Sequence, residues 1–126
     1  MTGYRIDENA QLVVLSFAGE VGYGDLVACI NECRSDPRYS PSFRGVADLR
    51  NVTLNLTRQE VIDLAGYVVG NEMTSGTWAL LADNPQNTAL SFLYMSVASQ
   101  QYPIRVFSSV EAASDFLGCP LHDLLP

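Results

Sequence analysis

Short apolar runs alternate with longer mixed segments along the chain, and this alternation predicts strands and helices in turn. Two runs near the N-terminus flank the polar Asp7-Glu8-Asn9 and predict a β-hairpin, whose second strand we expect to end at Gly19. The later runs are continuous rather than alternating, which is typical of strands buried in a parallel sheet. The five predicted strands are residues 4–6, 12–17, 45–49, 77–82 and 104–107.

The segments between these runs have helical spacing and recognisable ends. Thr57-Arg58-Gln59-Glu60 fits a capping box, in which the Thr57 hydroxyl accepts from the Glu60 amide and the Glu60 carboxylate accepts from the Thr57 amide. Asn84-Pro85 suits an N-cap followed by the first helical residue. Ser108-Ser109-Val110-Glu111 predicts a second capping box. The four predicted helices run from Gly22 to Asp36, from Thr57 to about Met73, from Pro85 to Pro103 and from Ser108 to Gly118.

The resulting order is ββαβαβαβα, with residues 50–56 interpreted as a polar loop. Strands that alternate with helices predict an α/β protein with a mostly parallel sheet and an antiparallel N-terminal hairpin. We expect Val46 to Leu49 and Trp78 to Leu81 to be inner strands. A chain of 126 residues suits one domain, residues 1–126.

Composition narrows the possible functions. All seven basic residues are Arg, so Schiff-base chemistry and the Walker phosphate loop, which need a Lys amine, are excluded. The net charge of −7 argues against a nucleic-acid partner. No apolar run reaches the roughly 18 residues of a membrane span, and the N-terminus lacks a signal-peptide pattern. We therefore expect a cytoplasmic protein without membrane insertion and without a cofactor.

The cysteines and the single histidine offer one candidate metal site. Cys29, Cys33, Cys119 and His122 together have the Cys₃His composition of a zinc ligand set. The alternative is that Cys29 and Cys33 are small buried hydrophobes. Their spacing is not C-x-x-C, and the C-terminal tail would have to fold onto the first helix. We interpret the chain as lacking both a metal site and catalytic residues, because His122 lies in that tail.

Several segments together resemble a known superfamily. They are Gly19-Glu20 after the hairpin, Val46 to Val52, Val106-Phe107, Glu111 to Ala113 and Phe116 to Gly118. The pattern is similar to that of STAS domains, whose founding members are bacterial anti-sigma-factor antagonists of the SpoIIAA type, and in particular to a small, largely uncharacterised bacterial branch. This resemblance implies a SpoIIAA-like fold and a non-enzymatic protein-interaction or regulatory module with a protein partner that the sequence does not identify.

The resemblance also indicates two candidate phosphorylation sites. In the antagonists a kinase phosphorylates a Ser in an Asp-Ser-Ser-Gly turn at a helix start. Here Leu56 stands near the Asp, Thr57 near the phosphoacceptor and Gln59 near the Gly, so the turn departs from that pattern. We interpret Thr57 first as a helix cap, with Thr57 and Thr53 as candidate regulatory sites.

The second and third predicted helices carry more apolar residues than one core-facing stripe requires. The surplus positions are Ile62, Gly66, Val69, Gly70, Met73, Phe92 and Met95. A two-fold interface would cover them, which predicts a homodimer. Alternatively, they form a crevice between the two helices, and the protein is a carrier or sensor of a small apolar, lipid-like ligand.

Overall fold

The computed structural model describes residues 2–125 and confirms the predicted order of elements. Within this range the elements are β1 (Thr2–Asp7), β2 (Leu12–Gly22), α1 (Tyr23–Ser35), β3 (Arg44–Asn55), α2 (Arg58–Gly70), β4 (Trp78–Leu81), α3 (Pro85–Ala98), β5 (Ile104–Phe107) and α4 (Val110–Leu117).

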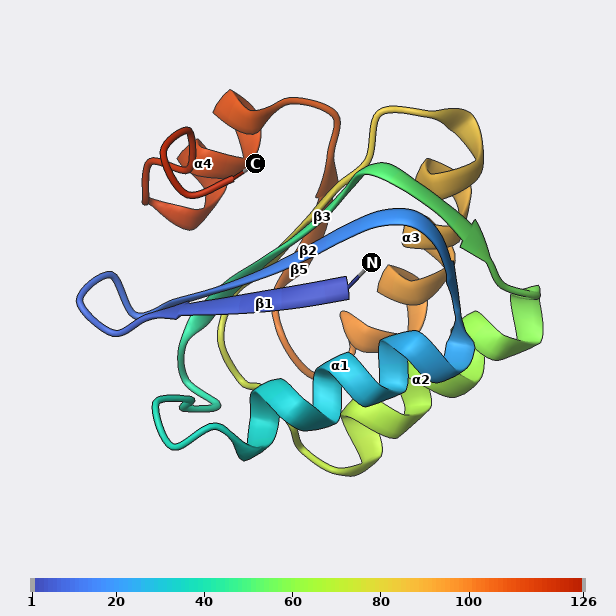
Figure 1. Cartoon of the computed structure of the whole chain (residues 1–126), viewed down its shortest axis with the longest axis horizontal. Coiled ribbons are helices and arrows are strands. Elements are labelled where there is room, and N and C mark those ends of the chain that lie inside the picture. Colours follow the sequence, from blue (N-terminus) through green and yellow to red (C-terminus); the bar gives the residue numbers. More distant parts are fainter. Residues whose placement is uncertain (1, 126) are drawn as a thin grey trace.

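One five-stranded sheet, in the order β1-β2-β3-β4-β5, forms the centre of the molecule (Figure 1). β1 runs antiparallel to β2, and the other neighbouring pairs are parallel. The predicted hairpin and the predicted inner strands are therefore confirmed, since β3 lies between β2 and β4, and β4 between β3 and β5.

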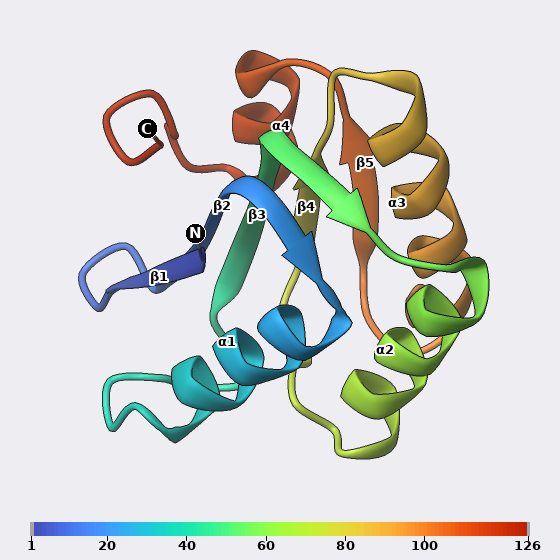
Figure 2. The ribbon, with the colours of Figure 1, turned by 45° about the vertical axis from the view of Figure 1, so that its right-hand side comes forward.

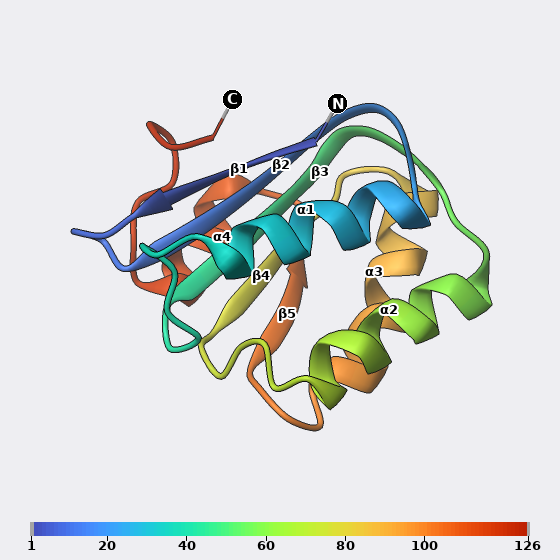
Figure 3. The ribbon, with the colours of Figure 1, turned by 60° about the horizontal axis from the view of Figure 1, so that its bottom comes forward.

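Side chains on alternate strand positions point to opposite faces of the sheet, and each face has its own core. The face that we call the helix face includes Val13, Leu15 and Ala47 and is covered by α1, α2 and α3. The face that we call the tail face includes Leu12, Val14, Val46 and Ala79 and packs against α4 and the C-terminal segment 119–125. The views in Figures 2 and 3 show α1 and α4 on opposite sides of the strands.

The expected loop at residues 50–56 is wrong, because β3 continues to Asn55 and β2 continues past Gly19 to Gly22. The two extensions pair with each other from Ala18–Asn51 to Gly22–Asn55. The register moves from Ser16–Asp48 to Ala18–Asn51, which places one extra residue in β3 as a β-bulge. Gly19 has a φ of 72°, a conformation that glycine adopts readily, so it bends β2 rather than ending it.

Two helices end earlier than the sequence predicted. α2 ends at Gly70, where the cap residue Asn71 donates its amide to the Tyr67 carbonyl and Glu72 takes a φ of 49°. The chain then turns back, and the Met73 amide donates to the Val68 carbonyl at 3.1 Å. This geometry ends the helix and directs Met73 into the core. α3 ends at Ala98 rather than Pro103.

The observed helix starts agree more closely with the sequence-based predictions than the helix ends do. The predicted capping box at Thr57 is present, and Asn84 caps α3 with Pro85 at its first position. At α4 the cap is Ser109, whose hydroxyl accepts from the Ala112 amide at 3.2 Å. The predicted Ser108–Glu111 capping box is therefore wrong, because the cap lies one residue later and Ala112, three residues after it, has no side-chain acceptor to complete a box. Gly118 ends α4 with a φ of 67°, as expected for a left-handed C-cap.

Candidate functional site

An apolar cavity of about 130 Å³ lies between the helix face of the sheet and the helices that cover it. Strands β2 to β5 form its floor, and α1, α2 and α3 form its walls. Its lining includes Leu15, Ala47, Leu80, Met73, Ser91, Tyr94 and Tyr102.

The space exists because β3 supplies little side-chain volume to the middle of this face. Ala47 pairs with Leu15 on one side and with Leu80 on the other, so a methyl group sits between two larger side chains. Two positions earlier, the indole of Trp78 covers Gly45, and a Cβ built there would lie 2.3 Å from the ring. Only glycine leaves room for the indole at that point, whereas nothing larger than the Ala47 methyl occupies the next position on this face.

Few polar groups reach the cavity, and one of them is unpaired. Ser91 is 3% exposed, and its hydroxyl is the one buried side-chain oxygen or nitrogen in residues 2–125 without a hydrogen-bond partner. The hydroxyls of Tyr94 and Tyr102 lie 3.4 Å apart, at the long end for a hydrogen bond. Thr74 is already engaged, because its hydroxyl accepts from the Trp78 indole at 2.8 Å.

The groups around the cavity are electrically neutral at physiological pH apart from one at its edge. Burial raises the pKa of the Tyr94 hydroxyl well above its ordinary value, and burial raises the pKa of the Cys33 thiol to about 12. Among the residues that line the cavity, only Arg34 carries a charge; its side chain is exposed and donates to the Asn71 carbonyl at 3.4 Å. The interior therefore suits an uncharged, largely apolar occupant.

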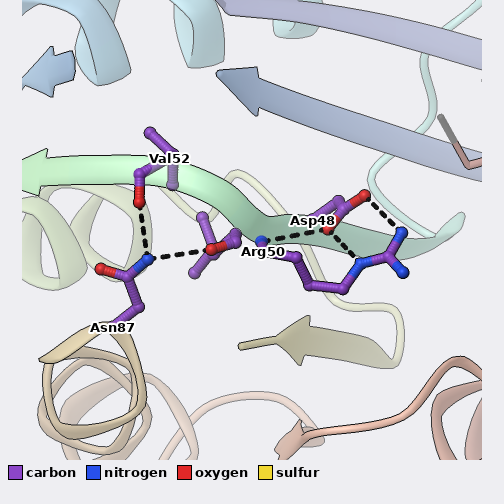
Figure 4. A network of polar contacts seen from close by, with 5 residues as sticks. Asp48, Arg50, Val52 and Asn87 are labelled. Atoms are coloured by element: carbon purple, nitrogen blue, oxygen red, sulfur yellow. Dashed lines mark hydrogen bonds and ion pairs between the residues drawn. The ribbon is translucent and has the colours of Figure 1, made fainter. Parts of the chain in front are cut away.

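A buried polar network that the sequence analysis did not predict lies at the β3 bulge (Figure 4). Arg50 binds the Asp48 carboxylate through Nε at 2.9 Å and Nη2 at 3.0 Å, and Asp48 is 2% exposed. The Asn87 side-chain amide donates to the carbonyls of Leu49 and Val52, each at 2.9 Å. β4 pairs with β3 only as far as Asp48, so Asn87 satisfies carbonyls beyond the end of β4. We interpret this network as structural.

The candidate phosphorylation sites lie apart from the cavity. Thr57 Oγ1 accepts from the Glu60 amide at 3.1 Å, and Glu60 Oε1 accepts from the Thr57 amide at 2.9 Å, so Thr57 is a helix cap. Thr53 is an exposed residue of β3. Neither residue lines the cavity.

The four zinc candidates are not brought together. Cys29 and Cys33 are buried in the helix-face core, whereas Cys119 is buried in the tail-face core. The His122 side chain is 62% exposed and lies 3.7 Å from Glu111. Within the described residues, no group of three or more His, Cys, Asp or Glu side chains could hold a metal ion.

The predicted interface residues divide between the interior and the surface. Met73 is 3% exposed and lines the cavity, so it belongs to the helix-face core rather than to an outer surface. Val69 and Met95 are half-buried. Ile62 and Phe92 are exposed, and a Cβ at Gly66 would meet no atom within 4 Å. Among the six predicted interface or crevice residues, Met73 alone contributes to the cavity lining.

Sequence reasoning missed Ser91, Tyr94 and Tyr102 as parts of one site. Tyr94 and Ser91 are three residues apart on α3, a spacing that places side chains on neighbouring parts of a helix surface. That spacing is a usable signal. The pairing of Tyr94 with Tyr102 depends on the end of α3 at Ala98, which the sequence analysis placed too late.

Comparison with known proteins supports the fold. No protein-family model matches the sequence, and no curated protein matches it. The structure is similar to the crystal structure of an uncharacterized protein of the DUF3478 family from Shewanella loihica PV-4, described as having a SpoIIAA-like fold. The TM-score is 0.60 at 10% sequence identity, and the match covers 93% of this chain and 92% of that chain.

This likeness defines the class of fold and nothing finer. The chain has a SpoIIAA-like α/β fold, as the sequence resemblance implied. At this level of identity the likeness carries no function with it, because one fold hosts many functions. Among the described residues, no helix has the length and apolar character needed to cross a membrane.

Proposed function

We propose that this protein is a non-enzymatic module that carries or senses a small apolar ligand held in the helix-face cavity. One observation carries the proposal: the cavity is apolar and contains a buried hydroxyl, that of Ser91, without a partner. Native interiors are close-packed and satisfy their buried polar groups, so a void and an unpaired hydroxyl in the same place favour an occupant.

The size of the cavity limits the ligand. Its volume of about 130 Å³ is close to that of an engineered apolar cavity of about 150 Å³ that stays dry and binds benzene. It is below the roughly 300 Å³ at which drug-sized pockets begin. The proposed ligand is therefore of single-ring size, and a long-chain lipid would require the helices to move apart.

A first experiment asks whether the cavity takes such a molecule. Native mass spectrometry of the purified protein should reveal an adduct, and ethylbenzene should raise the melting temperature of adduct-free protein, because a ligand that binds only the folded state stabilises it. Ala47→Leu fills the cavity and should abolish the ethylbenzene shift. If ethylbenzene leaves the wild-type melting temperature unchanged, and purified protein carries no adduct, the ligand-binding proposal is wrong.

A second candidate function is a protein-interaction module of STAS type that forms a homodimer through α2 and α3. The observation in its favour is that Phe92 is 50% exposed and Ile62 is 37% exposed, the exposed large hydrophobic residues of the described chain. Exposed apolar side chains that gather on one surface commonly mark interaction sites.

Light scattering tests the second candidate. We expect twice the chain mass at micromolar concentration, and Phe92→Asp should reduce it to the mass of one chain. His122→Asp is the control, because it adds a negative charge at a side chain that is 62% exposed and belongs to the C-terminal segment on the tail face, across the sheet from α2 and α3, so it should leave the dimer intact. Monomeric wild-type protein would eliminate the dimer and leave the ligand-binding proposal untouched.

A further inference from the structure

Ser91 is a polar group in a place where the chain offers it nothing to bind. It lies on the inner side of α3, is 3% exposed and lines the cavity. Leaving a buried hydroxyl unsatisfied destabilises a protein by more than a typical hydrogen bond stabilises it. A serine in a helix can also donate to the carbonyl four residues earlier, here that of Asn87, but no such bond is present.

A second hydrogen-bonding group borders the same space. The Tyr94 and Tyr102 hydroxyls are joined by a single 3.4 Å contact, in which either can donate. One such contact uses one of the two phenolic hydrogens. Ser91 and this tyrosine pair can therefore both donate, and both retain oxygen lone pairs that can accept. Each of these groups is complemented by an oxygen that can both donate and accept, which is the property of a hydroxyl group.

Ligands with a charged head group do not suit the cavity, because no residue of opposite charge is buried in it. No cation is buried with the ligand, because Arg34 is exposed at the edge of the cavity and already contacts the Asn71 carbonyl. A carboxylate or an ammonium group placed beside Ser91 would lose its hydration without gaining a partner of opposite charge.

We propose that the cavity selects a small neutral alcohol or phenol and that the Ser91 hydroxyl anchors the oxygen of that ligand. The inference rests on the proposed ligand-binding function and adds to it the class of ligand and the residue that selects it. The apolar ring or short chain fills the space above Ala47, and the ligand hydroxyl replaces the partner that Ser91 lacks.

Three probes of similar shape test this assignment: benzyl alcohol, ethylbenzene of nearly the same size without the hydroxyl, and benzoate with a charged head. Calorimetry should show that Ser91→Ala weakens the binding of benzyl alcohol by about tenfold, as expected for a lost hydrogen bond. The same substitution should change ethylbenzene binding by less than about twofold, since ethylbenzene makes no hydrogen bond. Benzoate should bind more weakly than benzyl alcohol.

The melting temperature of the ligand-free protein gives an independent test, in which Ser91→Ala should improve stability although it weakens ligand binding. Ser91→Ala should raise its melting temperature by a few degrees, because the variant removes an unsatisfied buried hydroxyl. Ser96→Ala is the control for helix propensity, since Ser96 is exposed on the same helix and its hydroxyl donates to the Leu93 carbonyl at 2.6 Å. A lower melting temperature for Ser91→Ala than for Ser96→Ala would show that Ser91 is already satisfied and would overturn the assignment.

The remaining outcomes separate the two proposals. If both neutral probes bind and Ser91→Ala affects neither, the anchor is wrong while the ligand-binding function stands. If benzoate binds more tightly than benzyl alcohol, the neutral class is wrong. If no probe binds to wild-type protein, the anchor is wrong, and if purified protein also carries no adduct, the ligand-binding function fails with it.

Discussion

The two faces of the central sheet share the same strands but differ in how they are filled. On the tail face, Val46 and Ala79 are fully buried against α4 and the C-terminal segment, where Leu121 is also fully buried. On the helix face, the neighbouring residue Ala47 borders a cavity of about 130 Å³. None of the buried residues of the tail-face core lines that cavity.

We propose that this difference assigns stability to the tail face and ligand binding to the helix face. A short helix and a tail close one face tightly, so this face can hold the strands in place. The three longer helices cover the other face and leave a space beneath them. Close packing makes added volume costly, whereas a void accepts it, so substitutions on the two faces should have effects of opposite sign.

The largest effect should come from the charge pair at the β3 bulge. Arg50→Ala leaves the Asp48 carboxylate, 3% exposed, without its partner. Breaking a buried ion pair destabilises by about 3–5 kcal/mol, and we expect a loss near 3 kcal/mol, the lower end. The reason is that 24% of the Arg50 side chain reaches solvent, so the pair is incompletely buried. Urea unfolding monitored by circular dichroism measures the loss.

The chain contains its own control for that experiment. Asp36 and Arg38 repeat the same two-residue spacing, with Nε at 3.0 Å and Nη2 at 2.8 Å from the carboxylate, but half of the Arg38 side chain is exposed. Arg38→Ala should therefore change stability far less than Arg50→Ala, because exposed ion pairs contribute little. Equal effects of the two substitutions would mean that burial of the Asp48 pair does not determine its contribution.

The next effect tests the packing of the tail face directly. Ala79→Leu adds three carbons where Ala79 is fully buried among Leu12, Val14 and Val46. Overpacking of a filled core typically costs about 1–3 kcal/mol, and we expect about 2 kcal/mol or more here. The midpoint of urea unfolding should fall accordingly. A variant as stable as the wild type would show that the tail face is also loosely packed.

A smaller effect concerns the helix layer that covers the cavity. Thr57→Ala removes the hydroxyl that accepts from the Glu60 amide and should destabilise the protein by about 1 kcal/mol. Thr57→Ser keeps the acceptor and should be nearly silent. Thermal unfolding of both variants makes the measurement. Stoichiometric phosphate on Thr57 in protein from native cells would instead support a regulatory role for this residue.

The sequence predicted the fold well because the features that define it are local. Apolar runs located the inner strands, and Thr57, Asn84-Pro85 and Gly118 marked helix ends through side-chain and backbone chemistry that acts over a few residues. The same local patterns did not predict the bulge in β3. It places Leu49 and Val52, three residues apart, in the same helix-face core, so the alternation that identifies a strand is interrupted there.

The candidate site was only partly predictable, because a cavity is a property of volumes that meet in space. The surplus of apolar residues on the second and third helices led to the hypothesis of an apolar ligand, yet Met73 alone of those surplus residues lines the cavity. Ala47 and Ser91 define the site by being small and by being unpaired, respectively. The sequence shows that Ala47 is small, but it does not show that a space lies above Ala47 or that the Ser91 hydroxyl has no partner.

The smallest predicted effect tests the difference between the two sheet faces most directly. Ala47→Leu adds the same three carbons as Ala79→Leu, from an adjoining strand, but into the cavity instead of a filled core. Filling a void commonly adds about 0.5–2 kcal/mol, and we expect a gain near 0.5 kcal/mol, because the new side chain loses rotamer freedom between Leu15 and Leu80. Unfolding of ligand-free protein in urea gives the difference between the two variants, which should exceed the effect of either one. If both substitutions destabilise by the same amount, the space above Ala47 is closed in solution, and the distinction between a filled face and an open one fails.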